Sequence, residues 1–96
     1  MGAREAFLAA RDLDPLPWRP TSQTEAAIRS AAHRMGAPLC DVAERFRQAA
    51  PQGATGSEGA DDHVHLTLRG QAFAARCMAE ALGALPGPLQ VPAEAL

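Results

Sequence analysis

The expected fold depends on residues 36–42, which read Gly36-Ala37-Pro38-Leu39-Cys40-Asp41-Val42. The glycine and the proline end a preceding helical pattern, and the apolar run that follows leads directly into a second one. A short apolar run between two helical patterns is typical of a buried strand, which needs neighbouring strands on both sides. The order helix, strand, helix therefore predicts an α/β fold, although the chain offers no convincing second strand.

Two helices are expected before this run. Residues 4–11 are rich in alanine and end at a cluster of prolines, which remove backbone donors. Ser22 and Glu25 form a capping-box pattern at the start of a second helix, whose apolar positions repeat with helical spacing as far as Gly36. The stretch between these helices is extended. It holds Trp18 and Arg19, which either face a pocket or pack on the chain itself.

Two more helices are expected after the run. Asp41 with Glu44 repeats the capping pattern and opens a short helix that Pro51 ends. A glycine-rich loop follows, and Thr67 is the expected N-cap of a last amphipathic helix over residues 68–82. These patterns predict a chain that is mostly helical in isolation, with one or two short strands.

The chain is expected to be a single partial domain over residues 1–96. Its parts are a helix and Pro-rich entry (1–20), a helix-strand-helix unit (21–51), a loop of catalytic type with the last helix (52–83), and a Pro-rich tail (84–96). Hydrophobic residues make up 47% of the sequence, but nearly half of them are alanine and Ile28 is the one isoleucine. The core that such residues build is thin, so the chain's independent stability is expected to be low.

Charge and apolar content exclude several classes of partner. The net charge is −2 and the arginines are scattered, whereas binding to nucleic acid needs a basic stripe. No apolar run approaches the length that spans a bilayer, and no cofactor-binding pattern is present. A cytoplasmic location is expected if Met1 is the true start.

Cys40 and Cys77 are too far apart for a metal knuckle and are expected to be reduced core residues.

Asp62 and His65 are the residues most able to support chemistry. They stand three positions apart in a turn that leads into the last helix. At this spacing the carboxylate can accept the Nδ1 hydrogen of the imidazole, which fixes the tautomer and leaves Nε2 as a base. Such a pair prepares a hydroxyl group for attack on an acyl carbon. The alternative is a surface turn in which Asp62 only caps the backbone.

The sequence resembles the C-terminal block of the SGNH (GDSL) hydrolases over the stretch Asp62-His63-Val64-His65-Leu66-Thr67-Leu68-Arg69-Gly70. Residues 36–42 are similar to the last sheet strand of that family. Residues 10–19 are similar to a bacterial subgroup associated with tetratricopeptide repeats. The resemblance covers most of residues 10–83. It implies the C-terminal portion of a three-layer α/β/α, flavodoxin-like domain that hydrolyses esters, with His65 as catalytic base and Asp62 as its orienting acid.

The chain departs from the family pattern in what it lacks. It contains no Gly-Asp-Ser block for the nucleophile and no asparagine for the oxyanion hole, and Leu68 stands where a proline is common. Half of a triad without its serine is expected to be inactive alone. The resemblance therefore implies a truncation or a decayed copy of a serine esterase. Its substrate would be an ester, such as an O-acylated carbohydrate or lipid.

Other readings of the same residues stay open. Ser57 lies in the loop before the pair, but its sequence lacks the strand-to-helix turn that exposes a nucleophile. His63 and His65 alternate and, with Asp61 or Asp62, offer ligands to a metal ion. A third possibility is a small helical interaction module without chemistry. Its exposed apolar faces would favour self-association, or a partner that supplies the missing N-terminal half.

Overall fold

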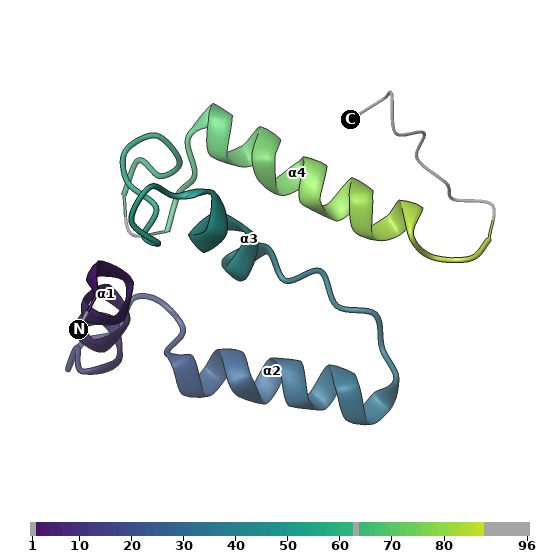
Figure 1. The fold of residues 1–96 in the computed structure, drawn as a ribbon, viewed down its shortest axis with the longest axis horizontal. Helices are drawn as coiled ribbons and strands as arrows, with labels where there is room; N and C mark the ends of the chain where they lie inside the picture. The colour runs from purple at the N-terminus through teal and green to yellow at the C-terminus, as the bar shows by residue number, and fades with distance from the viewer. Residues whose placement is uncertain (1, 63, 88–96) are drawn as a thin grey trace.

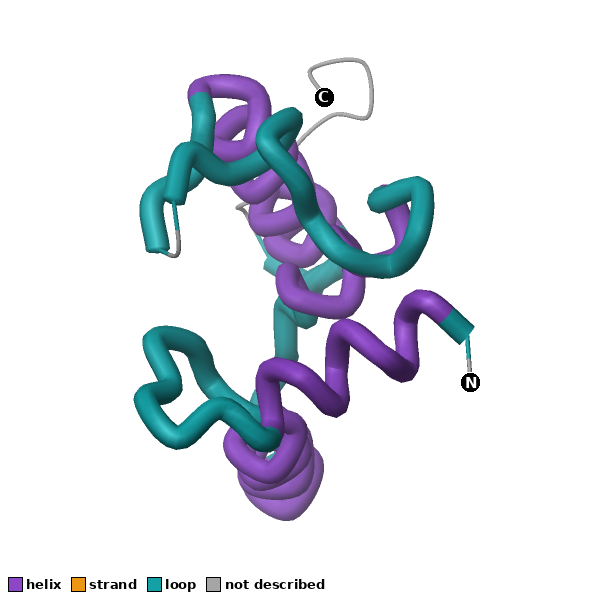
Figure 2. Tube along the Cα trace, turned by 90° about the vertical axis from the view of Figure 1, so that its left-hand side faces the viewer, coloured by secondary structure: helices purple, strands orange, loops and turns teal. Residues whose placement is uncertain are grey.

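Helices form most of the part of the chain that the structure describes. The computed structural model describes residues 2–62 and 64–87, which contain α1 (Ala3–Asp12), α2 (Ser22–Met35), α3 (Val42–Ala49) and α4 (Leu68–Gly83) (Figure 1). Colouring by secondary structure shows only helices and loops in this part of the chain (Figure 2). The predicted α/β fold is therefore wrong for the described residues, which hold four helices, no strand and no sheet.

The difference arises because the strand expected at residues 39–42 does not form. Residues 37–41 lie outside any regular element, and Val42 is already the first residue of α3. A strand is stabilised by hydrogen bonds to neighbouring strands, and the described residues supply none. Leu39 consequently stays 44% exposed, although its apolar neighbourhood predicted burial. The segment crosses from α2 to α3 as an extended connection (Figure 1).

The helix ends follow the expected capping chemistry with one correction. Thr21, not Ser22, is the N-cap of α2, because its hydroxyl accepts a hydrogen bond from the amide of Thr24. Asp41 caps α3 and Thr67 caps α4, as their positions in the sequence predict. Gly36 ends α2 with φ +62°, a left-handed conformation that glycine adopts without strain.

The apolar core lies between α3 and α4 and is small. Phe46 of α3 and Phe73 of α4 meet edge to face, with ring centroids 4.7 Å apart. Ala74 and Cys77 of α4 are the buried hydrophobic residues of the described chain. Other large side chains, such as Met35 and Leu68, remain mostly exposed. The thin core expected from the alanine-rich composition is confirmed.

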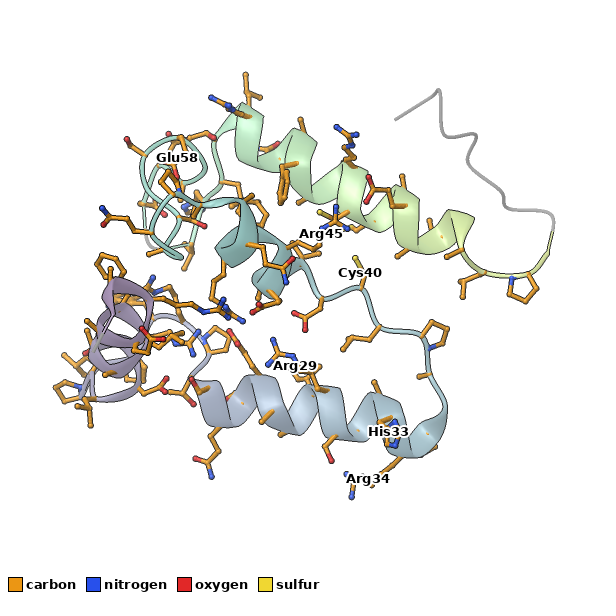
Figure 3. The ribbon with its side chains drawn as sticks, viewed as in Figure 1. Arg29, His33, Arg34, Cys40, Arg45 and Glu58 are labelled. Atoms are coloured by element: carbon orange, nitrogen blue, oxygen red, sulfur yellow. The ribbon has the colours of Figure 1, made fainter. Side chains whose placement is uncertain are left out.

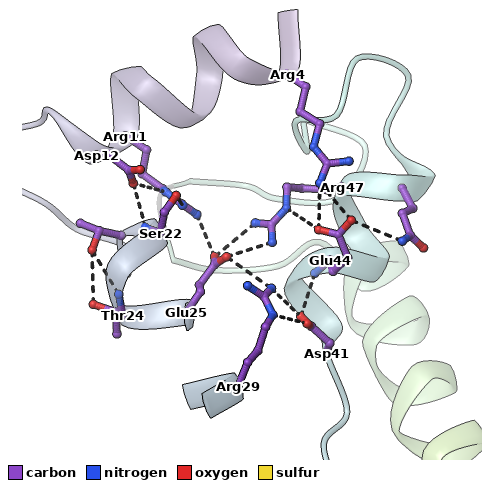
Figure 4. A network of polar contacts seen from close by, with 12 residues as sticks. Arg4, Arg11, Asp12, Ser22, Thr24, Glu25, Arg29, Asp41, Glu44 and Arg47 are labelled. Atoms are coloured by element: carbon purple, nitrogen blue, oxygen red, sulfur yellow. Dashed lines mark hydrogen bonds and ion pairs between the residues drawn. The ribbon is translucent and has the colours of Figure 1, made fainter. Parts of the chain in front are cut away.

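Ion pairs, rather than apolar contacts, join α1 and α2 to α3. The Glu25 carboxylate of α2 accepts from Arg11 of α1 at 2.8 Å and from Arg47 of α3 at 2.9 Å (Figure 4). Arg29 of α2 reaches Asp41, the N-cap of α3, at 2.6 Å. The side chains of Arg11, Glu25 and Arg47 are only 10–14% exposed, so these charges lie largely out of solvent. Such pairs stabilise only while both partners are present.

None of the helices in the described part of the chain is long and apolar enough to cross a membrane. The expected absence of a membrane-spanning helix therefore holds for these residues. Most of the predicted Pro-rich tail, residues 88–96, lies outside the described part.

Candidate functional site

A closed loop between α3 and α4 carries the candidate pair. Ala60 and Leu66 form a single antiparallel bridge, and the amide of Asp61 donates to the carbonyl of His65 at 2.9 Å. One step further, the amide of Thr67 donates to the carbonyl of Gly59 at 3.1 Å. These bonds hold the two arms of the loop together, so Asp62, Val64 and His65 lie at its tip.

Asp62 binds His65 at this tip, and its two carboxylate oxygens have different partners. Oδ2 of Asp62 lies 2.8 Å from Nδ1 of His65. Oδ1 accepts from the backbone amides of Val64 and His65, each at 2.8 Å. The contact expected from the spacing is therefore present, and the backbone bonds fix the carboxylate in place for it.

The electrostatics of the tip favour an ionised carboxylate. Hydrogen bonds from the amide of Val64, then from the amide and ring of His65, lower the pKa of Asp62 from its usual value of 3.8 to about 2. Because an ionised Asp62 accepts hydrogen bonds only, its ring contact requires hydrogen on Nδ1. The neutral imidazole then presents Nε2 as an acceptor, and no described residue forms a hydrogen bond with that atom.

Solvent surrounds the pair. The side chains of His65 and Asp62 are 75% and 50% exposed. A cavity of about 260 Å³ lies at the base of the same loop, lined by Phe46, Phe73 and neighbouring residues, but the pair is not among them. The site is therefore open to water on its reactive side. A catalytic base works best where water is excluded, so this side would need to be covered for catalysis.

Two glycines fix the loop to α4, and the sequence patterns did not single them out. Gly59 and Gly70 are both buried, and their backbones are in close contact. A Cβ on Gly70 would overlap the carbonyl oxygen of Gly59, the same oxygen that accepts from Thr67. Glycine at position 70 therefore brings the loop onto the first turn of α4 and places His65 just before that helix.

The other candidate residues do not join this site. His63, which the metal hypothesis needs, lies outside the described residues. In the described part of the chain, no three His, Cys, Asp or Glu side chains gather closely enough to hold a metal ion. Ser57 is exposed in a turn of the same loop. Trp18 and Arg19 line a separate cavity of about 90 Å³ with Arg11, Asp14 and Pro17.

We expect the Asp62 carboxyl group to titrate with a pKa of about 2. Because the folded-state pKa is lowered, the stabilisation of the tip is complete above pH 3.8 and is lost as the pH falls through about 2. His65→Ala should return this pKa only part of the way toward 3.8, since the backbone amides contribute more than the ring. Carbon-13 NMR titration of the carboxyl group measures both values, and an unshifted pKa would contradict the geometry.

Comparison with known proteins assigns no family to this chain. No protein-family model, no curated protein and no solved structure matches the chain. The resemblance to SGNH hydrolases therefore remains an expectation from the sequence stretches at residues 10–19, 36–42 and 62–70.

Proposed function

We propose that this chain supplies the acid-base half of an ester-hydrolysing site, as a C-terminal segment similar to that of an SGNH-type esterase. His65 takes the proton from a hydroxyl nucleophile through Nε2, and Asp62 orients the ring and stabilises the imidazolium that forms. The contact between Oδ2 of Asp62 and Nδ1 of His65 carries the proposal.

Three features of the tip support this role over that of a simple turn. An Asp that only caps a turn needs one oxygen, and Oδ1 of Asp62 already accepts both amides. The second oxygen is then available to the imidazole. The closed loop and the two glycines hold the pair at the entrance of a helix. A preorganised base of this kind contributes about 10²–10⁴-fold to proton transfer.

The nucleophile comes from outside the described residues in this proposal. The exposed Nε2 side of His65 leaves room for a hydroxyl group, and no Gly-Asp-Ser block occurs in the sequence. Large apolar side chains on α2 and α4, Met35 and Leu68 among them, are also exposed. Exposed apolar surface of this kind favours a covering polypeptide, and a separate N-terminal segment could bring the nucleophile that a second copy of this chain lacks. The block on its own is inactive toward esters.

The test begins with the polypeptide encoded directly upstream of Met1. We expect that polypeptide to hold a Gly-Asp-Ser block and, when coexpressed with this chain, to hydrolyse an unactivated alkyl ester. His65→Ala should lower kcat by about 10²-fold or more. An unactivated ester is needed because free imidazole attacks p-nitrophenyl esters directly as a nucleophile.

His33→Ala is the matched control. His33 is an exposed histidine of α2 and should leave kcat unchanged when it is replaced. An upstream polypeptide without a serine block would contradict the proposal, and so would esterase activity that survives His65→Ala. If this chain alone hydrolyses the ester, the nucleophile lies within it and the need for a second polypeptide is wrong.

A further inference from the structure

The two cysteines line a single cavity, although 37 positions separate them in the sequence. The cavity has a volume of about 370 Å³ and lies between the extended segment before α3 and the middle of α4. Cys40 belongs to the extended segment and points toward α4 (Figure 3). Cys77 comes from α4, and both thiols are free.

A guanidinium group also lies at this cavity. Arg45 of α3 lines the same cavity and donates to the Glu80 carboxylate at 2.8 Å. The pKa of Arg45 is raised chiefly by this hydrogen bond. Its positive charge is held at the cavity that both cysteines line. A nearby cation favours the thiolate, which is the form that reacts with peroxides and disulfides.

Exposure distinguishes the two thiols. Cys77 is only 1% exposed, so dissolved reagents do not reach it directly. Cys40 is partly exposed at the cavity wall. Redox-active cysteine pairs commonly combine one accessible thiol that meets the oxidant with a second, protected thiol that resolves it.

We propose that Cys40 and Cys77 are an oxidisable pair that a hydroperoxide converts into an intramolecular disulfide. In the first step the Cys40 thiol attacks the peroxide, forms a sulfenic acid and releases water or an alcohol. In the second, the Cys77 thiol attacks that sulfenic acid and forms the disulfide bond, and the hydroxide that leaves takes up the thiol proton as water. The hydroperoxide is reduced and the two thiols are oxidised by two electrons together.

The disulfide ties residues 37–41 to α4. That segment has no regular structure, and it connects α2 to the part of the chain that contains the core. A covalent link there restricts the unfolded chain and limits how far α2 moves from α4. This function is independent of the Asp62 and His65 pair, whose loop lies at the other end of α4 (Figure 1).

The test treats the reduced full chain with hydrogen peroxide, alkylates the remaining thiols after denaturation, and then digests the chain with trypsin. We expect a peptide pair in which residues 35–45 are linked to residues 77–96, and which separates on reduction. In Cys77→Ser, dimedone should trap a sulfenic acid on Cys40, whereas in Cys40→Ser it should leave Cys77 unlabelled. Complete alkylation of both thiols after peroxide treatment would overturn the proposal. So would disulfides that form only between chains.

The role of the guanidinium has its own comparison. Arg45→Gln should slow disulfide formation several-fold, because it removes a positive charge from the cavity that both cysteines line. Arg76→Gln is the matched control, since Arg76 also binds Glu80, at 3.2 Å, but does not line the cavity. Equal rates for the two variants would show that Arg45 does not activate the pair.

Discussion

Glu25→Ala is expected to lower the free energy of unfolding by about 2–4 kcal/mol, a large part of the stability of so small a domain. The Glu25 carboxylate forms ion pairs with Arg11 and Arg47, which come from two different helices. All three side chains are largely out of solvent. Burial raises the pKa of Glu25, but the two arginines outweigh this and hold it below its usual value. Removing the carboxylate leaves two partly buried cations without their shared acceptor.

Urea denaturation followed by circular dichroism measures this loss. Glu5→Ala is the matched control, since Glu5 occupies the first turn of α1 as Glu25 does that of α2, but is exposed. We expect the control to change the free energy of unfolding by less than about 0.5 kcal/mol. If the two variants lose equal stability, the ion pairs around Glu25 do not hold α1, α2 and α3 together.

Gly70→Ala is expected to destabilise the folded chain by about 2 kcal/mol and to displace the loop that carries Asp62 and His65. Alanine alone would favour the helix by up to about 1 kcal/mol over glycine. The new Cβ, however, overlaps the carbonyl oxygen of Gly59. This is a backbone atom, so a side-chain rotation cannot relieve the overlap. The loop must therefore leave α4 or the helix must shift.

Amide hydrogen exchange and denaturation test this together. Protection of the Thr67 amide, which donates to Gly59, should fall in Gly70→Ala. Gly56→Ala is the control from the same loop, because its Cβ meets only the mobile end of the Glu58 side chain. We expect a loss of less than about 1 kcal/mol there. Unchanged protection of the Thr67 amide in Gly70→Ala would contradict the close contact of the two glycines.

Local signals in the sequence predicted the helices well, and the long-range arrangement much less. Alanine-rich amphipathic stretches, Gly36, Asp41 and Thr67 each predicted a helix or a helix end that the structure contains. The strand prediction at residues 39–42 failed because an apolar run forms a strand only where other strands pair with it. The ion pairs around Glu25 depend on how three helices meet, and helical periodicity carries no information on that.

The local contact in the candidate site was predicted from the sequence, and the long-range contacts around it were not. The contact between Asp62 and His65 spans three residues, so spacing alone predicted it. The closeness of Gly59 to Gly70 was missed, although both are glycines near the site and a buried glycine often marks close backbone approach. The shared cavity of Cys40 and Cys77 was missed too, because it depends on how α4 lies beside the extended segment.

The proposed chemistry depends on the Asp62 carboxylate holding hydrogen on Nδ1 of His65. Nitrogen-15 NMR of the ring, at a pH where the imidazole is neutral, measures this directly, with His33 of the same chain as an internal reference. We expect His65 to be the Nδ1–H tautomer, with Nε2 unprotonated, and Asp62→Asn to abolish that preference. An Nε2–H tautomer at His65 that Asp62→Asn does not change would contradict the account.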